Sequence, residues 1–306
     1  MTKEQYLKNL SVPTGKVDVV LDTDAFNEVD DQFAISYLLK YRDRFNVKGL
    51  LAAPFLNTKS VSAKDGMEKS YAEILKLLSI MGLDDLRNIV YKGSEEFLRD
   101  EATPSGSPAA DFLAALANEY SPENPLYVLC IGAITNVASA ILKNPSIREN
   151  CVIVFLGGRA KGVTEPAGEF NMKQDIAAAR VVFNSGVPFI QITGKGVTDR
   201  LLTSKFELEH WLKGKNALCD YLYENVVAEA ESYAKGKAWS RVIWDVVVVA
   251  WLLNTDGRYL EEITIPCHIP EYDLSYSFDD TRRQIRYVQW VNRDAIFTDL
   301  FKKLAE

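Results

Sequence analysis

The stretch VDVVLDTDAFNEVDD, residues 17–31, joins a short apolar run directly to a group of acidic residues. Residues 17–21 are apolar at all but one position, which predicts a strand. In residues 31–41 the apolar side chains recur at helical spacing, which predicts a helix. A strand that leads straight into a helix is the building unit of a parallel sheet. The stretch therefore predicts an α/β fold with acidic side chains where the first strand ends.

The rest of the chain repeats this alternation of strand and helix. Apolar runs predict further strands at residues 47–53, 88–91, 126–131, 151–156 and 188–192, and near 262–270 and 285–291 in the tail. Helical patterns cover residues 58–81, 204–253 and 293–304. This order predicts a mostly parallel, doubly wound sheet with helices on both faces, then a helical segment and a small C-terminal strand pair. We expect residues 1–306 to form a single domain.

Composition and charge argue against several classes of protein. The 306 residues are 47% hydrophobic and carry a net charge of −7, and no run of Lys or Arg exceeds two residues, which argues against a nucleic-acid surface. No apolar stretch reaches the ~18 residues that a membrane span needs. The N-terminus lacks the apolar core of a signal peptide. Because the four cysteines are isolated from one another, we expect reduced thiols and a cytoplasmic location.

The histidine content narrows the chemistry that the chain can perform. The sequence has two histidines, His210 in a charged helical segment and His268 near the predicted tail strands. A Ser-His-Asp triad or a histidine-rich zinc site would need one of these two. We therefore expect any catalysis to depend on carboxylates.

Five carboxylates follow the first predicted strand: Asp22, Asp24, Glu28, Asp30 and Asp31. Clustered like charges raise the cost of ionising each neighbour, and a hard cation with oxygen ligands removes that cost. Helix capping by Asp30 or Asp31 is the alternative explanation, but it accounts for only one or two of the five. The cluster therefore predicts a metal-binding or catalytic role.

Three further parts of the sequence contain polar side chains that are candidates for binding a ligand. Asp245 interrupts the last long apolar run, where it either caps a helix or supplies the acidic cluster with a distant ligand. Glu169 and Asn171 follow a glycine-rich stretch and could both face a polyhydroxyl ligand, although acidic loop residues are common. Asn57 and the pair Thr135-Asn136 come after predicted strands, and turn or cap roles are the alternative for them.

Taken together and in this order, these residues resemble the inosine-uridine-preferring nucleoside hydrolase family. The resemblance covers roughly residues 17–250 and rests on Asp22-Thr23-Asp24, Asp30-Asp31, Thr135-Asn136, Gly157-Gly158 followed by Glu169-Phe170-Asn171, and Asp245 in an apolar helix. It implies Ca²⁺-dependent hydrolysis of the N-glycosidic bond of ribonucleosides to ribose and free base. It also implies a homodimer or homotetramer, with a small ribonucleoside rather than a nucleic acid or a membrane as partner.

The resemblance assigns a role to each matching residue. One Ca²⁺ would be held by Asp24, Asp31, Asp245 and the backbone carbonyl of Ile131. Asp24 would also act as general base toward a water on the ion, because Ca²⁺ orients the water and lowers its pKa. The ribose hydroxyls would be held by Asp30, Asn57, Glu169 and Asn171, with Asp22 behind them. The surrounding carboxylates would stabilise positive charge that develops on the sugar.

This sequence departs from the family pattern in several places. The segment between Asp24 and Asp30 is two residues longer than the family's usual form, and we expect Asn27, within the extension, to reach the ribose. The loop at residues 93–108 lacks the family's usual histidine. The residue before the late aspartate, often a histidine in the family, is Trp244 here.

Trp244 bears on the choice of base. Purine-preferring members of the family carry a similar tryptophan, and stacking on an indole is worth about 1–3 kcal/mol per base. Trp244 therefore predicts a preference for purine ribosides, and a place in the apolar core is the alternative for it. A second aromatic side chain on the opposite face of the base is not evident, and Phe26 and Phe97 are the candidates.

Two other functions compete with nucleoside hydrolysis. The first is a haloacid-dehalogenase-type Mg²⁺ phosphatase, which would use Asp22-Thr23-Asp24 and recruit Lys195, but leaves Asp30, Asp31 and Asp245 unexplained. The second is a riboside-binding protein that keeps the site and lacks catalysis. A nucleoside panel separates both from a hydrolase, because only a hydrolase releases free base and ribose.

Overall fold

The computed structural model describes residues 1–163 and 168–306 of the chain. Its main sheet contains β1 (Val17–Thr23), β2 (Phe45–Ala52), β3 (Val90–Lys92), β4 (Leu126–Cys130), β5 (Cys151–Leu156), β6 (Phe189–Ile192), β9 (Leu260–Pro266) and β12 (Gln284–Val291). Two short antiparallel pairs consist of β7 (Leu202–Thr203) with β8 (Arg241–Val242), and β10 (Ile269–Pro270) with β11 (Tyr276–Ser277).

The helices of the described chain connect these strands. They are α1 (Lys3–Asn9), α2 (Asp30–Lys40), α3 (Ala63–Ile80), α4 (Pro108–Leu116), α5 (Thr135–Lys143), α6 (Ile147–Asn150), α7 (Phe170–Gln174), α8 (Ile176–Ser185), α9 (Lys205–Trp211), α10 (Ala217–Ala234), α11 (Val246–Leu253) and α12 (Arg293–Ala305). Short 3₁₀ helices are η1 (Asp84–Ile89), η2 (Ala117–Glu119) and η3 (Thr198–Arg200).

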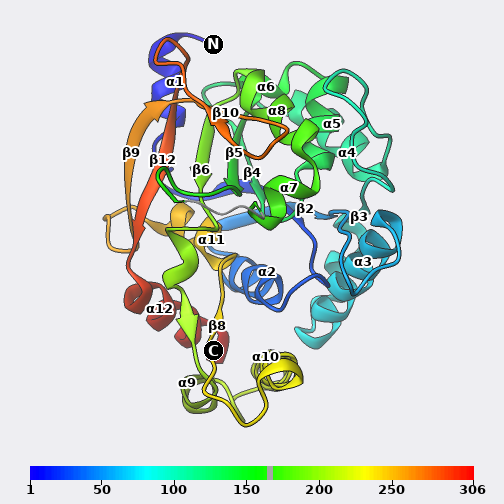
Figure 1. Cartoon of the computed structure of the whole chain (residues 1–306), viewed down its shortest axis with the longest axis vertical. Coiled ribbons are helices and arrows are strands. Elements are labelled where there is room, and N and C mark those ends of the chain that lie inside the picture. The colour runs from blue at the N-terminus through cyan, green and yellow to red at the C-terminus, as the bar shows by residue number, and fades with distance from the viewer. Residues whose placement is uncertain (164–167) are drawn as a thin grey trace.

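The strands of the main sheet lie in the order β3-β2-β1-β4-β5-β6-β12-β9 (Figure 1). All neighbouring strands from β3 to β12 run parallel, and β9 pairs antiparallel with β12 at one edge. β1 lies between β2 and β4, with Leu21 opposite both Leu50 and Leu129. The residues of β1 from Val19 to Thr23 are buried, and the apolar run Val19–Leu21 is typical of a strand covered on both faces.

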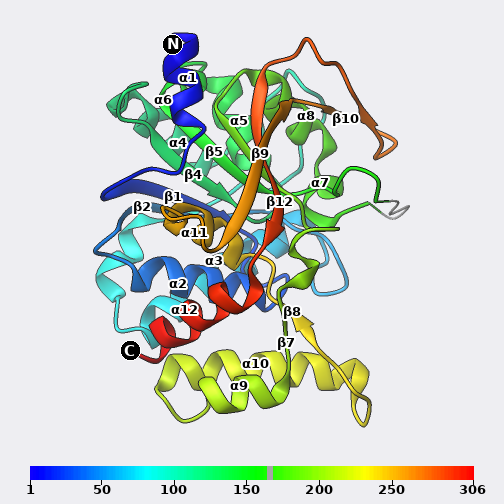
Figure 2. The same cartoon turned by 90° about the vertical axis from the view of Figure 1, so that its left-hand side faces the viewer.

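Helices cover both faces of the sheet and form two separate cores (Figures 1 and 2). One core is built from α2, α3, α11 and α12, and α9 and α10 lie outside this layer, below α2 and α12 in Figure 2. The other core is built from α4, α5 and α8. The apolar helix α11 is fully surrounded because every one of its residues is buried, as expected of a helix that is hydrophobic all round.

The predicted α/β architecture is confirmed, with differences in the second half of the chain. The tail strands form β9 and β12 and join the main sheet, while the small C-terminal pair is β10 with β11. The segment at residues 204–253 is not one helical run, since β8 separates α10 from α11. In the described part of the chain, no helix is long and apolar enough to cross a membrane.

Candidate active site

A pocket opens where β1, β4, β5 and β6 end, at the edge of the sheet where parallel folds bind ligands. The predicted site residues that line it are Asp24, Asn27, Asp30, Asp31, Ile131, Glu169, Asn171, Trp244 and Asp245. Asn57 does not line the pocket but lies directly behind Asn27, whose Oδ1 accepts a hydrogen bond from Asn57 Nδ2 at 2.6 Å. The structure therefore brings together residues that are more than 200 positions apart in sequence.

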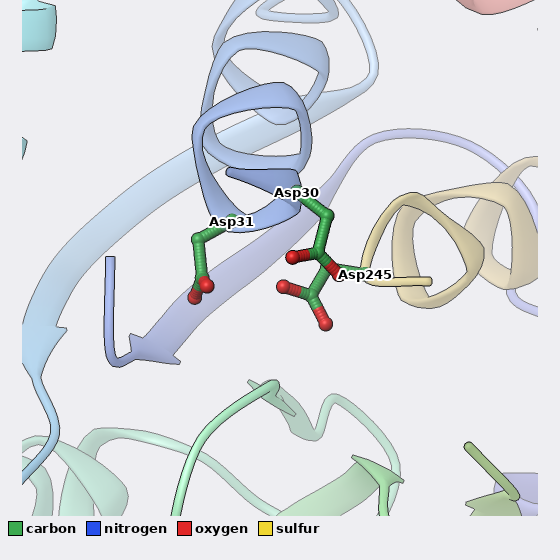
Figure 3. A group of neighbouring side chains, drawn as sticks. All are labelled: Asp30, Asp31 and Asp245. Carbon is green, nitrogen blue, oxygen red and sulfur yellow. The ribbon is translucent and has the colours of Figure 1, made fainter. Parts of the chain in front are cut away.

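The N-termini of two helices bring the side chains of three aspartates close together (Figure 3). Asp30 and Asp31 form the first turn of α2, and Asp245 directly precedes α11. Each of the three is buried and offers an oxygen within 4.8 Å of the oxygens of the others. The positive ends of the two helix dipoles favour negative charge at this place.

Helix capping does not explain these aspartates. The N-cap position of α2 is occupied by Val29, so Asp30 and Asp31 lie inside the helix. Asp245 stands at the N-cap position of α11, but its side chain accepts no capping hydrogen bond from the described backbone. Asp31 is oriented instead by Thr23, whose hydroxyl donates to Asp31 Oδ1 at 2.5 Å. The carboxylates thus remain available for a ligand in the pocket.

Burial and mutual repulsion raise the pKa of every aspartate in this group. Desolvation raises the pKa of Asp31 to about 7, and a hydrogen bond joins its carboxyl to that of Asp245. Burial, followed by the charges of neighbouring carboxylates, raises the pKa values of Asp24, Asp30 and Asp245 well above the ordinary range. Such a cluster requires either bound protons or a cation.

The acidic group is suited to a metal ion. Asp30, Asp31 and Asp245 meet closely enough to share one cation, and Asp24 lines the same pocket. One oxygen of Asp24, Oδ2, is buried and has no hydrogen-bond partner in the described chain. An unpaired buried carboxylate oxygen is costly, and coordination to a cation satisfies it. The donors are all oxygens, which suits a hard ion.

Asp22 supports the pocket from behind rather than lining it. Its Oδ1 accepts a hydrogen bond from Asn136 Nδ2 at 2.8 Å, and Asn136 Oδ1 in turn accepts from the backbone N–H of Ser94 at 2.8 Å. Burial raises the pKa of Asp22 to about 7. Asn136 therefore ties the end of β1 to the segment that follows β3, a structural role other than the predicted turn or cap, since Ile134 is the N-cap of α5 and Asn136 lies inside that helix.

Glu169 and Asn171 form one wall of the pocket and are held in place by the backbone. Glu169 is the N-cap of α7, and its carboxylate accepts hydrogen bonds from the N–H groups of Gly158, Asn171 and Met172. Asn171 Nδ2 donates to the carbonyls of Ile131 and Leu156, each at 3.0 Å. With its amide nitrogen engaged, Asn171 has its Oδ1 left as the atom that can accept from a bound hydroxyl.

Trp244 is half-buried and lines the pocket while it also packs against the larger core. Its Nε1 donates to Asp199 Oδ1 at 3.3 Å. Two cations lie near its ring: Lys195 Nζ is 5.8 Å from the ring centroid, and Arg241 Cζ is 5.4 Å from it. Trp244 therefore combines the two predicted alternatives, with part of the ring in the core and part at the pocket.

Comparison with known proteins identifies the family. The sequence profile described as inosine-uridine preferring nucleoside hydrolase matches residues 19–297. The chain belongs to this family. As a nucleoside hydrolase it is an enzyme that acts on N-glycosyl bonds, so the phosphatase and the inactive riboside-binding protein are set aside.

Individual nucleoside hydrolases are similar to this chain at low sequence identity. The pyrimidine-specific ribonucleoside hydrolase RihA of Citrobacter koseri is 25% identical over 257 residues, 70% of this chain and 81% of its own. RihA of Klebsiella pneumoniae is 24% identical over 301 residues, 83% of this chain and 92% of its own. A plant nucleoside hydrolase superposes with a TM-score of 0.75 at 20% identity, over 96% of this chain and 99% of its own, and shares the fold.

Sequence reasoning missed two residues of this nucleoside hydrolase pocket. Phe170 lines it, and Arg241 approaches it by pairing with Glu28, a member of the predicted acidic cluster that also lines the pocket. Phe170 is the phenylalanine among the described lining residues, whereas Phe26 and Phe97, the candidates for a second aromatic, do not line this pocket. Phe170 follows Glu169 directly in the family motif, and that adjacency was the available signal.

Proposed function

We propose that the protein is a Ca²⁺-dependent ribonucleoside hydrolase that releases ribose and free base and prefers purine ribosides. The observation that carries this proposal is the meeting of Asp30, Asp31 and Asp245 in the pocket that Asp24 also lines. Hard oxygen donors favour Ca²⁺ over zinc, since no described histidine or cysteine lines this pocket.

The proposed metal ligands are Asp24, Asp31, Asp245 and the carbonyl of Ile131, with Asp30 close enough to take part. When bound, the ion would lower the pKa of a water and orient the ribose diol. The carbonyl of Ile131 already accepts from Asn171 Nδ2, and a carbonyl oxygen has a second lone pair for the cation. Asn171 would thus link the metal shell to the ribose wall.

Each remaining role falls to a residue with suitable geometry. Asp24, with an unpartnered buried oxygen, would take a proton from the attacking water. Glu169 and Asn171 would hold ribose hydroxyls, because both are fixed by the backbone and line one wall. Asn27 would reach the ribose from the rim, steadied by Asn57, and Asn57 would therefore act through Asn27 or after a local rearrangement.

The preference for purines rests on Trp244. Its position on the pocket wall supports contact with the base, and a purine offers a larger face for stacking than a pyrimidine. Relatives with either preference are known: the RihA relatives are named pyrimidine-specific, and a purine-preferring ribonucleoside hydrolase from Gardnerella vaginalis superposes with a TM-score of 0.73 at 19% identity. The base preference therefore needs its own experiment.

The test is a panel of inosine, adenosine, guanosine, uridine and cytidine, assayed on the wild type and on Trp244→Ala for release of base and ribose. We expect the wild type to prefer purine ribosides, and Trp244→Ala to lose about 5- to 150-fold of kcat/KM on purines, the equivalent of about 1–3 kcal/mol of stacking. A wild-type preference for uridine, or an equal loss on purines and pyrimidines, would contradict the stacking role.

Three further statements belong to the proposal. We propose a single domain for residues 1–306, because the main sheet draws strands from both ends of the chain, from β1 to β12. We propose a homodimer or homotetramer on the resemblance to the family. All four cysteines are buried free thiols, which supports a reducing, cytoplasmic location.

A further inference from the structure

A glycine-flanked turn after β6 places Lys195 at the pocket. The backbone N–H of Lys195 donates to the carbonyl of Gly158 at 3.3 Å, and the Lys195 carbonyl accepts from the N–H of Ala160 at 2.7 Å. These bonds extend the contact between β5 and β6 and fix the turn beyond the end of the sheet. Gly196 has a φ of +93°, a left-handed conformation that favours glycine.

Close packing also explains the glycine on the other side of Lys195. A side chain at Gly194 would bring its Cβ to 3.0 Å from Cγ of Glu169, a tight contact that glycine avoids. Lys195 is therefore held beside Glu169, and its charge lowers the pKa of that carboxyl against the larger effect of burial. Both glycines beside Lys195 therefore serve the turn: Gly196 adopts its left-handed backbone conformation, and Gly194 allows its close approach to Glu169.

Lys195 is the one cationic side chain among the described lining residues of the pocket. Its Nζ makes no ion pair and no hydrogen bond with any residue in 1–163 or 168–306, and it lies 5.8 Å from the centroid of the Trp244 ring. The neighbouring cations are engaged: Arg241 pairs with Glu28, and Lys59 pairs with Glu229 at 2.8 Å. Among the described residues, the Lys195 ammonium thus acts on Glu169 through its charge alone and keeps its N–H donors free for a bound molecule.

The reaction needs a positive or proton-donating group at the leaving base. When the N-glycosidic bond breaks, its electron pair goes to the base, and an unprotonated heterocycle is a poor leaving group. Asp30, Asp31 and Asp245 gather at the N-termini of α2 and α11, where they are proposed to hold the metal ion. The indole N–H of Trp244 is directed to Asp199, so it does not meet the base. Lys195 lies beside both Glu169 and Trp244, between the proposed ribose wall and the proposed base wall.

We propose that Lys195 is the catalytic residue that protonates the departing base, an inference that rests on the proposed nucleoside hydrolase function. As the bond from C1′ to the base nitrogen breaks, its electron pair stays on the base, which takes a proton from the Lys195 ammonium. The oxygen of the attacking water bonds to C1′, and Asp24 takes one proton of that water. Ribose and neutral base leave. Lys195 then regains a proton from solvent, and Asp24 returns its proton to solvent.

The test compares substrates that differ in their need for a proton on the leaving group. Inosine and uridine need it, whereas p-nitrophenyl β-D-ribofuranoside releases a stable phenolate without it. We expect Lys195→Met to lose about 10²–10⁴-fold in kcat on the nucleosides, the usual share of general acid catalysis, and to keep kcat on the phenyl riboside within about 5-fold. Lys195→Arg keeps the charge but cannot release a proton, so it should fail on nucleosides to a similar extent.

Lys173→Met is the matched control, since Lys173 is an exposed lysine of α7 that does not line the pocket. It should leave both classes of substrate unaffected. If Lys195→Met cleaves inosine and uridine as well as the wild type, or loses the nucleosides and the phenyl riboside equally, the role of Lys195 is overturned. If the wild type itself cleaves no riboside, the proposed function fails, which is a distinct result.

Discussion

Replacement of Asp245 by asparagine should distinguish two effects on stability. One is the electrostatic repulsion among the carboxylates of Asp30, Asp31 and Asp245, and the other is the stabilisation that a bound cation provides. The oxygens offered by Asp30, Asp31 and Asp245 lie within 4.8 Å of one another. At this distance and an effective dielectric constant of about 20, two full negative charges repel by about 3.5 kcal/mol. Three ionised carboxylates would carry this cost three times over, so we expect the metal-free protein to retain protons here, in line with the raised pKa values.

A bound Ca²⁺ should therefore stabilise the wild type measurably. At a free concentration 100 times the dissociation constant, one bound ion adds about 2.7 kcal/mol to the free energy of unfolding. For a chain of 306 residues, this corresponds to a rise in Tm of about 4 °C. The rise should be larger at pH 8 than at pH 6, because the ion must displace protons from carboxyls whose pKa is near or above 7.

The assay is thermal unfolding with a chelator and then with excess Ca²⁺, at both pH values, together with metal analysis of the purified protein. We expect Asp245→Asn to lose most of the Ca²⁺-dependent rise, while its metal-free Tm at pH 8 equals or exceeds that of the wild type. Asp299→Asn is the matched control, since Asp299 accepts hydrogen bonds from Tyr37 and Tyr41 on the far side of α2. It should lower Tm equally with and without the ion. A full Ca²⁺ response in Asp245→Asn, or bound zinc, would refute the reasoning.

Three other predictions concern catalysis, substrate and pH. Asp24→Asn should keep the fold but lose about 10²–10⁴-fold in kcat, with metal content measured alongside, and turnover near the wild-type value would exclude a general base role. Because Glu169 and Asn171 are fixed to receive hydroxyls, 2′-deoxy and 5′-deoxy nucleosides should fall at least about 100-fold in kcat/KM, and equal values for a riboside and both analogues would contradict this. Burial lowers the pKa of His268 to about 4, so the native state keeps this histidine neutral while the unfolded chain protonates it near pH 6.5. Its contribution to stability is therefore complete above pH 6.5 and is lost as the pH falls toward 4, by up to about 3 kcal/mol. Urea unfolding of His268→Phe should show a weaker loss over this range than the wild type, and an identical slope would rule His268 out as the cause.

The features that sequence predicted well are local ones. The strand at residues 17–21, the helix at residues 31–41 and the acidic residues between them are readable because apolar spacing and strand ends depend on neighbouring positions. The apolar runs of β4 and β5 were equally clear, since strands covered on both faces need continuous apolar sequence. Asp245 was recognisable as unusual because a carboxylate in an apolar run is costly.

The features that escaped prediction depend on contacts between distant segments. The ion pair of Arg241 with Glu28 joins residues 213 positions apart, and neither has a local pattern that marks it. Asn57 was expected at the ribose, but its amide is taken by Asn27, a contact set by how two loops meet. The place of Lys195 in the pocket follows from the approach of its turn to Glu169, which no property of the Gly-Lys-Gly sequence reveals alone.

The position of β12 has a consequence for how the chain is made. The six strands from β3 to β6 in the sheet come from the first two thirds of the chain, but β6 acquires its outer neighbour only when β12 is synthesised, with Ile190 opposite Arg286. Until then β6 is an open edge with unpaired backbone groups and apolar neighbours, the kind of edge to which another chain can add. Long-range pairing of this type is also slow, because the chain loses the entropy of closing a long loop before the stabilising contacts form. Ribosome stalling or truncation between residues 246 and 283 would therefore leave a nascent chain with its acidic pocket residues already present and its sheet prone to aggregate through β6.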